Sequence, residues 1–434
     1  MCVNKLTKIA IIFFAFTVAG LGFLHAVPTE AQAWKIDHRE LKLFRKAMQK
    51  IQEDYAREVK DKELINGAIN GMLQSLDPHS SYLTEDLFKE LQVETKGEFG
   101  GLGIEITLEN GILTVVSPIE DTPAFKAGLM PGDRIIKIAG EDTKNITLME
   151  AVKRMRGPRG TKITITVVRN GKKPEDYTIT RDIIHVQSVK TQLLEKGYPY
   201  IRLVSFQENT VKDLGEAVKK HLTQGQLKGL MLDLRNNPGG LLEQAVKVSN
   251  LFIDKGLIVY TDGRTGDQRM EFRASRTGEH YQFKVAVLIN GGSASASEIV
   301  AGCLQDHQRA LLFGEKSFGK ASVQTIIPLE NGGALRLTTA YYYTPRGRHI
   351  QKKGIQPDVD MKTELEKQRE QELAKENQDK SDKKKQSWRT GKVDPAKDLP
   401  VAKALKWLKS GQTVEQFREE HEDKAKQETA RAPE

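Results

Sequence analysis

Cysteine is nearly absent from this sequence, which has 2 cysteines in 434 residues. Cys2 lies in an N-terminal stretch with the pattern of a signal peptide, so the mature chain is predicted to keep only Cys303. A single cysteine excludes an internal disulfide. The apolar neighbours of Cys303 favour a small buried side chain over a nucleophile.

Metal-binding motifs are also lacking. The 9 histidines include no H-E-x-x-H pattern, and Cys303 has no cysteine close to it in the sequence. We therefore expect neither a metal site nor a cofactor.

The N-terminal apolar run is too short to cross a bilayer. It covers Ile9–Leu24, which is 16 residues, whereas a transmembrane helix needs about 20. Lys5 and Lys8 precede the run, and an A-x-A site ending at Ala33 follows it. This pattern predicts a signal peptide over residues 1–33, with an uncleaved anchor as the alternative. We expect export, most simply to the periplasm, with association with the inner membrane as a variant.

The chain has no strong excess of positive or negative charge. Lys and Arg number 67 and Asp and Glu 58, for a net charge of +9. Removing residues 1–33 takes away Lys5, Lys8 and Glu30 and leaves +8. No basic patch interleaved with aromatic residues accompanies this charge, so no nucleic-acid partner is expected. A solvated exterior explains the surplus, and peripheral association with an anionic membrane is the alternative.

Changes in composition and in the pattern of apolar residues along the chain predict an α/β multidomain protein. The predicted parts are a signal peptide (1–33), an N-terminal helical segment (34–75), a linker or part of the core (76–94), a strand-rich module (95–184), a core that alternates strand and helix (185–361) and a charged C-terminal tail (362–434). Of the 73 residues in the tail, 34 are charged, and we assign no chemistry to it. Within the tail, "VAKALKWLKS" predicts a small amphipathic helix that docks on another part of the chain.

The N-terminal segment shows helical spacing of apolar residues. Leu41, Phe44, Met48 and Ile51 follow a 3, 4, 3 pattern, and a second helix is predicted near Glu63–Leu73. Two short amphipathic helices bury little surface by themselves. We therefore expect this segment to pair subunits of a homo-oligomer.

The string "GGSASASEIVAGCLQ" follows a predicted buried strand, "KVAVLIN", and begins a predicted helix. A helix N-terminus directs free N–H groups at developing negative charge, so a serine there is well placed as a nucleophile. The alternative is that Ser293, Ser295 and Ser297 merely cap the helix. The residues by themselves leave both interpretations open.

A serine nucleophile needs a base. His307 is the nearest histidine but lies in a polar stretch after the helix, whereas Lys320 lies in "SFGKASVQ". Burial lowers the pKa of a lysine, and we expect Phe318, Val323 and the apolar strand "ALLFG" to supply that environment. Gln324 falls on the same side as Lys320 in either a strand or a helix, so its amide is expected to hold the amine.

Donors for an oxyanion are expected in "DLRNNPGGLLEQA", where Gly239 and Gly240 leave backbone N–H groups uncovered at the start of a helix. An ordinary strand–helix turn is the alternative. A competing motif is "GEKSFGKA", which nearly matches the phosphate-binding loop G-x-x-x-x-G-K-[ST]. Ala321 occupies its last position, so the hydroxyl that would bind Mg²⁺ is missing.

Five separated motifs resemble, in order, those of the carboxyl-terminal processing peptidases, also called tail-specific serine proteases. They are "LDPHSSYL", "FGGLGIEI", "AGLMPGDRIIKIAGED", "LDLRNNPGGLL" and "NGGSASASEIVAGCLQDHQRALLFGEKSFGKASVQ". The resemblance implies a crotonase-like α/β serine-protease core with a serine–lysine dyad. It implies Ser295 as nucleophile, Lys320 as base and Gln324 as supporting partner. The oxyanion donors would come from the Gly239-Gly240 turn and the backbone of Ala296. Ala321 departs from the glycine of many relatives, which leaves the dyad intact.

The same resemblance implies that the 95–184 module is a PDZ domain. "FGGLGIEI" places a glycine-rich turn before an edge strand, where a peptide can add as a further strand with its terminal carboxylate in a backbone nest. The expected peptide-binding residues are Gly100, Gly101, Leu102, Gly103 and Ile104. A small β-module without a ligand is the alternative.

Together these features predict an exported serine endopeptidase that recognises protein or peptide C-termini and cleaves near them. The alternative is a non-catalytic PDZ scaffold on a degenerate protease fold. The presence of Ser295, Lys320 and Gln324 argues against that alternative.

Overall fold

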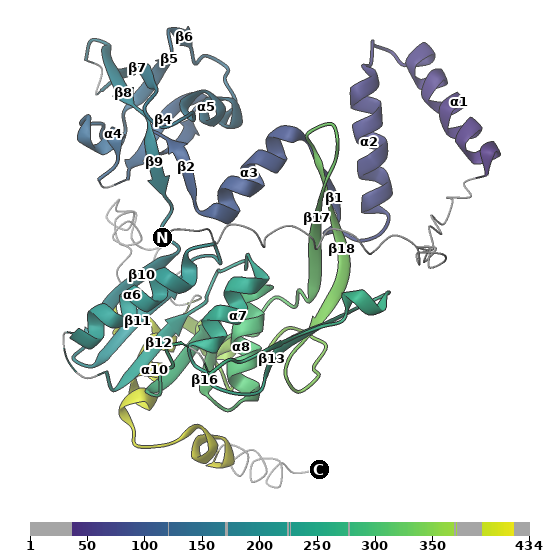
Figure 1. The fold of residues 1–434 in the computed structure, drawn as a ribbon. Helices are drawn as coiled ribbons and strands as arrows, with labels where there is room; N and C mark the ends of the chain where they lie inside the picture. The colour runs from purple at the N-terminus through teal and green to yellow at the C-terminus, as the bar shows by residue number, and fades with distance from the viewer. Residues whose placement is uncertain are drawn as a thin grey trace, which may run out of the picture. The chain divides into compact units, whose positions relative to one another are not determined.

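The computed structural model describes residues 37–420 except 120, 170–171, 224, 226, 277, 369 and 371–392 (Figure 1). The predicted signal peptide lies outside the described residues. The chain divides into two units, Met1–Ala68 and Ile69–Glu434. Within the described residues, no helix is both long enough and apolar enough to cross a membrane.

Two helices form the N-terminal segment, α1 (His38–Asp54) and α2 (Asp61–Gln74), as the apolar spacing predicted. The side chain of Asp37 accepts a hydrogen bond from the Arg39 N–H and so caps α1. No residue of α1 is buried, and its apolar residues Leu41, Phe44 and Ile51 are exposed. The apolar face that the sequence predicted is therefore uncovered in the single chain.

The strand-rich module is a six-stranded antiparallel sheet in the order β3-β4-β5-β7-β8, with β6 beside β5. Its strands and helices are β3 (Ile104–Glu109), β4 (Ile112–Pro118), α4 (Pro123–Lys126), β5 (Arg134–Ile138), β6 (Glu141–Asp142), α5 (Leu148–Met155), β7 (Lys162–Val168) and β8 (Glu175–Thr180). Ile163, Ile165 and Val167 alternate along β7 and are buried, as expected for a strand with one face on a core. Strand β3 lies at the edge of the sheet, as predicted.

Two antiparallel strands connect this module to the core, β2 (Glu98–Gly101) and β9 (Asp182–His185). Helix α3 (Glu85–Lys96) precedes β2. It begins at Thr84, whose hydroxyl accepts from the Leu87 N–H, and it ends at Gly97, which has the left-handed φ of 72° that favours glycine.

The core sheet has six strands in the order β10-β11-β12-β15-β16-β19, parallel from β11 onward. Its strands and the helices that follow them are β10 (Val189–Glu195), β11 (Tyr198–Leu203), α6 (Thr210–Thr223), β12 (Gly229–Asp233), α7 (Leu242–Asn250), β15 (Lys284–Ile289), α8 (Ala296–Asp306), β16 (Ala310–Gly314) and β19 (Val359–Asp360). Every residue of β12 and β16 is buried. A parallel sheet buried on both faces explains why these strands are continuous apolar runs.

The two faces of this sheet pack against different helices. Leu230 and Leu232 of β12 belong to the cluster that contains the residues of α7 and α8, whereas Met231 belongs to a second cluster with helix α10 (Leu399–Lys409). The period of two along a strand produces this division. Helix α10 confirms the predicted docking helix, so this part of the C-terminal tail is a structural layer of the core.

A second sheet has the order β1-β18-β13-β14, with β17 also paired to β18. Its elements are β1 (Ser81–Leu83), β13 (Leu257–Gly263), the short 3-10 helix η1 (Gly266–Gln268), β14 (Met270–Arg273), β17 (Ser322–Pro328) and β18 (Ala334–Tyr343). Ser81 of β1 pairs with Arg336 of β18. This pairing brings the residues just before β1 to the strands that follow Lys320.

Candidate active site

The three alternating serines have different surroundings: Ser293 and Ser295 lie in the turn between β15 and α8, and Ser297 lies in the first turn of α8. Ser293 and Ser297 are fully buried, and their hydroxyls donate to the carbonyl oxygens of Leu234 (2.8 Å) and Asn237 (2.9 Å) in the turn after β12. Ser295 between them is partly exposed. The hydroxyls of the outer two serines are engaged by buried carbonyl oxygens, whereas Ser295, which forms a capping box with Glu298 at the start of α8, is the partly exposed one.

Ser295 has an unusual backbone conformation, with φ 54° and ψ −116°, directly before α8. A non-glycine residue in such a region costs on the order of 1–3 kcal/mol and persists only where its surroundings hold it. Its N–H donates to Oε2 of Glu298 at 2.9 Å, and its carbonyl oxygen accepts from the Tyr342 hydroxyl at 3.0 Å. Both neighbours are fully or almost fully buried.

Glu298 connects the serine turn to the lysine loop. Its Oε1 accepts from the Ser317 hydroxyl (2.5 Å) and the Gly319 N–H (2.7 Å), and its Oε2 accepts from the N–H groups of Ser295 and Lys320, both at 2.9 Å. Burial raises the pKa of Glu298, and these four hydrogen bonds oppose that rise because they favour the carboxylate. The main chains of Ser295 and Lys320 therefore meet at one carboxylate oxygen.

Tyr342 makes a second link between the same two residues. Its hydroxyl contacts the carbonyl oxygens of both Ser295 and Lys320. Burial raises the pKa of Tyr342 well above the ordinary tyrosine value, so the group stays a hydrogen-bond donor.

The pKa of Lys320 is lowered, first by burial and next by the positive charge of Arg336, whereas Asp77 and Glu298 raise it. The lowered pKa agrees with the role of a base. Burial is the cause that the sequence predicted, although Phe318 itself is 59% exposed. The charge of Arg336 on strand β18 is a second cause that the sequence analysis did not predict.

The segment before β1 supplies groups near Lys320 that the sequence analysis left without a role. Asp77 accepts from the N–H of His79 (2.7 Å) and from the N–H and hydroxyl of Ser80 (2.9 and 2.8 Å). The pKa of His79 is lowered by burial and then by the charge of Lys320. The turn-forming "DPHSS" string was visible in the sequence, but only the pairing of β1 with β18 brings it to the lysine.

Gln324 lies in β17, and Lys320 lies before that strand begins. The Gln324 side-chain nitrogen donates to the hydroxyls of Ser322 (2.8 Å) and Thr338 (3.3 Å). Among the described residues no hydrogen bond joins Gln324 to Lys320. Its support of the lysine stays a prediction.

The turn after β12 brings Gly239 against the serine. A Cβ on Gly239 would lie 2.8 Å from the Cβ of Ser295 and 3.0 Å from the nitrogen of Ala296, and its φ of 104° also requires glycine. The Gly239 N–H donates to Oδ1 of the buried Asn237 at 2.9 Å. An oxyanion would have to compete with this side chain for that donor.

Gly240 has a different neighbour. A Cβ there would lie 2.2 Å from the carbonyl oxygen of Phe206, at the start of the α6 segment. Gly239 is therefore the glycine that lies against Ser295, and the choice of oxyanion donor between Gly239 and Gly240 stays a prediction.

The alternatives weighed from the sequence fit less well. His307 follows the C-terminal end of α8, opposite to Ser295, and its Nε2 lies 2.7 Å from the carbonyl oxygen of Leu257. The near phosphate-binding loop leads into strand β17, whereas such a loop binds phosphate at the start of a helix. Cys303 is buried, as predicted, and burial raises the pKa of its thiol to about 12.

The expected peptide-binding residues fall into two groups, which corrects the predicted turn. Gly100 and Gly101 lie in β2 and pair with Ile183 and Asp182 of β9. Gly100 is needed there because a Cβ would lie 2.2 Å from the Gly157 carbonyl oxygen.

The turn itself is shorter. It consists of the buried Leu102 and of Gly103, whose φ is 78°. Ile104 then opens the edge strand β3, and helix α5 contacts that strand. An edge strand beside a helix is the arrangement to which a peptide can add as a further strand.

Comparison with known proteins identifies the class. Residues 197–361 match the family described as Peptidase family S41, residues 90–168 match the PDZ domain and residues 23–87 match the "Activating protease CtpB N-terminal domain". Together with the serine turn and the edge-strand module, these matches define a serine-type peptidase with a PDZ domain.

The relatives narrow the class to one family. The chain is 53% identical over 326 residues to a carboxy-terminal-processing protease of Bartonella bacilliformis, covering 74% of this chain and 75% of that protein. It is 39% identical over 316 residues to the carboxy-terminal processing protease CtpA of Bacillus subtilis, covering 72% and 67%. It is 37% identical over 368 residues to a carboxyl-terminal-processing protease of Synechocystis, covering 80% and 84%. The chain belongs to the carboxy-terminal processing proteases of peptidase family S41.

Proposed function

We propose that this protein is an exported endopeptidase that uses a Ser295–Lys320 dyad to cleave envelope proteins near their C-termini. The observation that carries the proposal is the shared Glu298 oxygen, 2.9 Å from the main-chain nitrogens of both Ser295 and Lys320. A crotonase-like relationship of the core is part of the proposal. The repeated strand–helix units β12-α7 and β15-α8 support it.

The dyad would act by general base and nucleophilic catalysis. The neutral amine of Lys320 takes the proton of the Ser295 hydroxyl as its oxygen attacks the scissile carbonyl. The developing oxyanion accepts hydrogen bonds from the Ala296 N–H, at the start of α8, and from the Gly239 turn. The protonated Lys320 returns its proton to the leaving amine, and water then hydrolyses the ester on Ser295.

Substrate selection is assigned to the PDZ domain. A chain terminus would add to β3 as an edge strand, with its carboxylate at the turn of Leu102 and Gly103. The test uses one fluorogenic peptide in two forms, with a free C-terminal carboxylate and with a C-terminal amide. We expect kcat/KM to be at least tenfold higher for the free carboxylate. Equal values for the two forms would remove the PDZ domain from the proposal.

The same assay distinguishes enzyme from scaffold. Ser295→Ala should leave no cleavage above the uncatalysed rate, while peptide binding persists. If the wild-type protein and Ser295→Ala cannot be told apart, the non-catalytic scaffold is the better description.

Export is proposed from the signal-peptide pattern of residues 1–33. The protein recovered from cells is expected to begin at Trp34, in the periplasm or at the surface of the inner membrane. Intact-mass measurement of the purified protein tests this. A chain that keeps Met1 and fractionates with integral membrane proteins would support the uncleaved anchor.

A homo-oligomer is proposed from the exposed apolar residues of α1. Deleting residues 34–75 should shift the protein to a smaller species in gel filtration with light scattering, because the apolar face that pairs subunits is removed. The folding control is the cleavage rate of a peptide whose cleavage does not depend on a free C-terminus. An unchanged oligomer would place the subunit contact elsewhere.

A further inference from the structure

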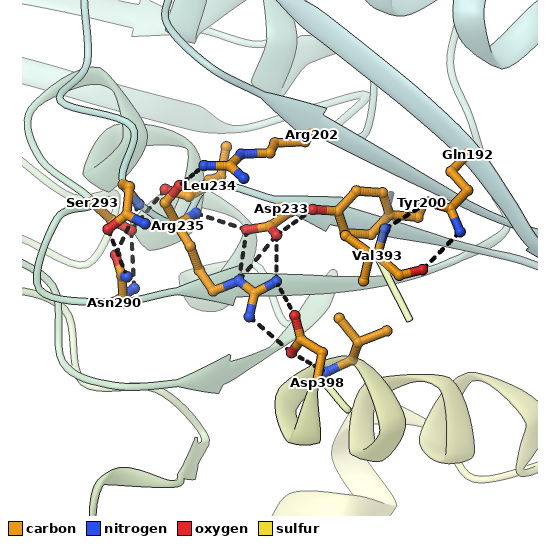
Figure 2. Close-up of polar contacts among 12 residues, drawn as sticks. Gln192, Tyr200, Arg202, Asp233, Leu234, Arg235, Asn290, Ser293, Val393 and Asp398 are labelled. Carbon is orange, nitrogen blue, oxygen red and sulfur yellow. Dashed lines mark hydrogen bonds and ion pairs between the residues drawn. The ribbon is translucent and has the colours of Figure 1, made fainter. Parts of the chain in front are cut away.

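Arg235 joins the catalytic turn to the C-terminal segment. It lies between β12 and the turn that reaches Gly239. Its guanidinium donates to both oxygens of Asp398, at 2.9 Å from Nη1 and 2.8 Å from Nη2 (Figure 2). Such a two-point pair fixes the orientation of both planes.

The other side of the Arg235 guanidinium faces Asp233, which is fully buried. Nε and Nη2 donate to this carboxylate at 3.0 and 2.7 Å, and the Tyr200 hydroxyl donates to it at 2.6 Å. Burial raises the pKa of Tyr200, so its hydroxyl remains a donor. Arg235 is therefore held between one carboxylate of the core and one carboxylate of the C-terminal segment.

The residues after Arg235 continue to the site. Asn236 has a left-handed φ of 55° and exchanges hydrogen bonds with the Asn290 side chain, both at 2.9 Å. At the next residue, Asn237, the carbonyl oxygen accepts a hydrogen bond from the Ser297 hydroxyl, and the side-chain Oδ1 accepts one from the Gly239 N–H. Hydrogen bonds therefore hold the residues between Arg235 and Gly239, the glycine that lies against Ser295.

Asp398 also determines where α10 begins, because its Oδ1 accepts from the Val401 N–H at 3.3 Å and caps the helix. The other end of α10 is fixed by Lys284, whose ammonium donates to the carbonyl oxygens of Trp407 and Ser410 at 2.8 and 2.9 Å. The same ammonium lies 4.1 Å from the centre of the Trp407 ring.

A further contact precedes the helix. Gln192 and Val393 exchange two hydrogen bonds of 2.8 Å, which attach the start of the segment to β10 (Figure 2). The segment 393–410 is therefore attached to the core at its start, at Asp398 and at its end. Of these three attachments, the Asp398 contact is the one made to a residue that directly follows β12, in the segment that reaches Gly239.

We propose that residues 393–410, here named the C-terminal strap, hold the oxyanion turn in its productive geometry, with Asp398 as a positioning residue that acts through Arg235. This inference rests on the proposed serine protease function and adds a role for the C-terminal segment. A displacement of about 1 Å in a catalytic group can cost on the order of 10²-fold in rate. Loss of the Asp398 carboxylate should therefore lower kcat with little change in KM.

The experiment compares variants of the full mature chain on the fluorogenic peptide with the free carboxylate. Asp398→Ser keeps an oxygen that caps α10 but removes the partner of Arg235. Asp398→Glu restores the carboxylate on a longer stem. Lys409→Ala is the matched control, because it breaks the exposed ion pair of α10 with Glu195 at the opposite end of the helix.

We expect Asp398→Ser to lower kcat about tenfold or more at unchanged KM, Asp398→Glu to recover part of the loss, and Lys409→Ala to match the wild type. Thermal unfolding of each variant is measured alongside. If the kcat of Asp398→Ser lies within twofold of the kcat of Lys409→Ala, the proposed role of the C-terminal strap is wrong. An effect of Asp398→Ser on KM alone would also overturn it. Failure of the proposed function would look different, because the wild-type protein itself would then cleave no better than Ser295→Ala.

Discussion

Replacing Lys320 with alanine or arginine is expected to abolish peptide cleavage while the protein stays folded. Alanine removes the base, and arginine keeps a guanidinium that stays protonated. The loss in kcat/KM should match that of Ser295→Ala, because nucleophile and base act as one unit. Peptide cleavage and far-UV circular dichroism are measured for each variant. Turnover retained in purified Lys320→Ala would falsify the dyad.

The pH dependence of cleavage follows from the lowered pKa of Lys320. The amine acts as a base only when neutral, so kcat/KM should rise with pH through the Lys320 pKa, at a pH below that of an ordinary lysine. Arg336→Gln removes a positive charge that lowers this pKa, and should move the rise in activity to higher pH. An unmoved profile would assign the titration to another group.

The stability of the folded protein should also rise with pH, for the same reason. Because the folded protein holds the Lys320 proton less strongly than the unfolded chain does, charging this amine opposes folding. That penalty is complete below the folded-state pKa and disappears as the pH rises toward the ordinary lysine value. Lys320→Met, which has no amine to charge, should therefore unfold at a higher denaturant concentration than the wild type at neutral pH.

Glu298→Gln is expected to lower kcat/KM by about 10²-fold or more, and to destabilise the fold by about 2–4 kcal/mol. Each carboxylate oxygen of Glu298 accepts two hydrogen bonds. In the glutamine variant an amide nitrogen replaces one of these two oxygens. Its own N–H groups would then face hydrogen-bond donors, and the bonds on that side would be lost. The strained conformation of Ser295 would then lose a group that maintains it.

Peptide kinetics and denaturant unfolding measure both effects of Glu298→Gln. Glu271→Gln on β14 is the control, because that side chain is exposed and, among the residues that the structure describes, forms an ion pair with Arg273 alone. If Glu298→Gln loses stability but keeps kcat/KM, the carboxylate contributes to folding and leaves the dyad geometry to other contacts.

Much of the architecture could be predicted because it depends on local patterns. The buried strands β12 and β15 are continuous apolar runs, and the helices that follow them begin directly after glycine-containing turns. The alternation along β7 and the amphipathic spacing of α1 were equally direct. In each case the period of the apolar residues is set by the element itself.

The site was harder to predict, since its neighbours come from distant segments. Phe318 was expected, with Val323 and the strand "ALLFG", to supply the apolar environment of Lys320, yet its side chain is 59% exposed. Arg336 and Asp77 also affect the pKa of the amine. Arg336 lies on β18, and the pairing of β1 with β18 brings the segment of Asp77 to this strand. Proximity in sequence is a poor guide to the surroundings of a loop side chain.

The tail shows the same difference. The helix α10 was predicted from its amphipathic spacing, but the tail was given no chemistry because its charges nearly cancel. Asp398 looked like one charge among 34 in the segment. Its contact with Arg235 depends on which face of the core sheet α10 covers.

The amino-acid sequence by itself determined the elements, their order and the residue types able to do acyl-transfer chemistry, because apolar periodicity and turn residues act within one element. Only the tertiary structure decided which of three serines is partly exposed, which glycine lies against it and which charges act on the pKa of the lysine. Those properties arise where strands and turns distant in sequence share one buried carboxylate, and burial changes hydrogen bonding and charge at the atoms it encloses.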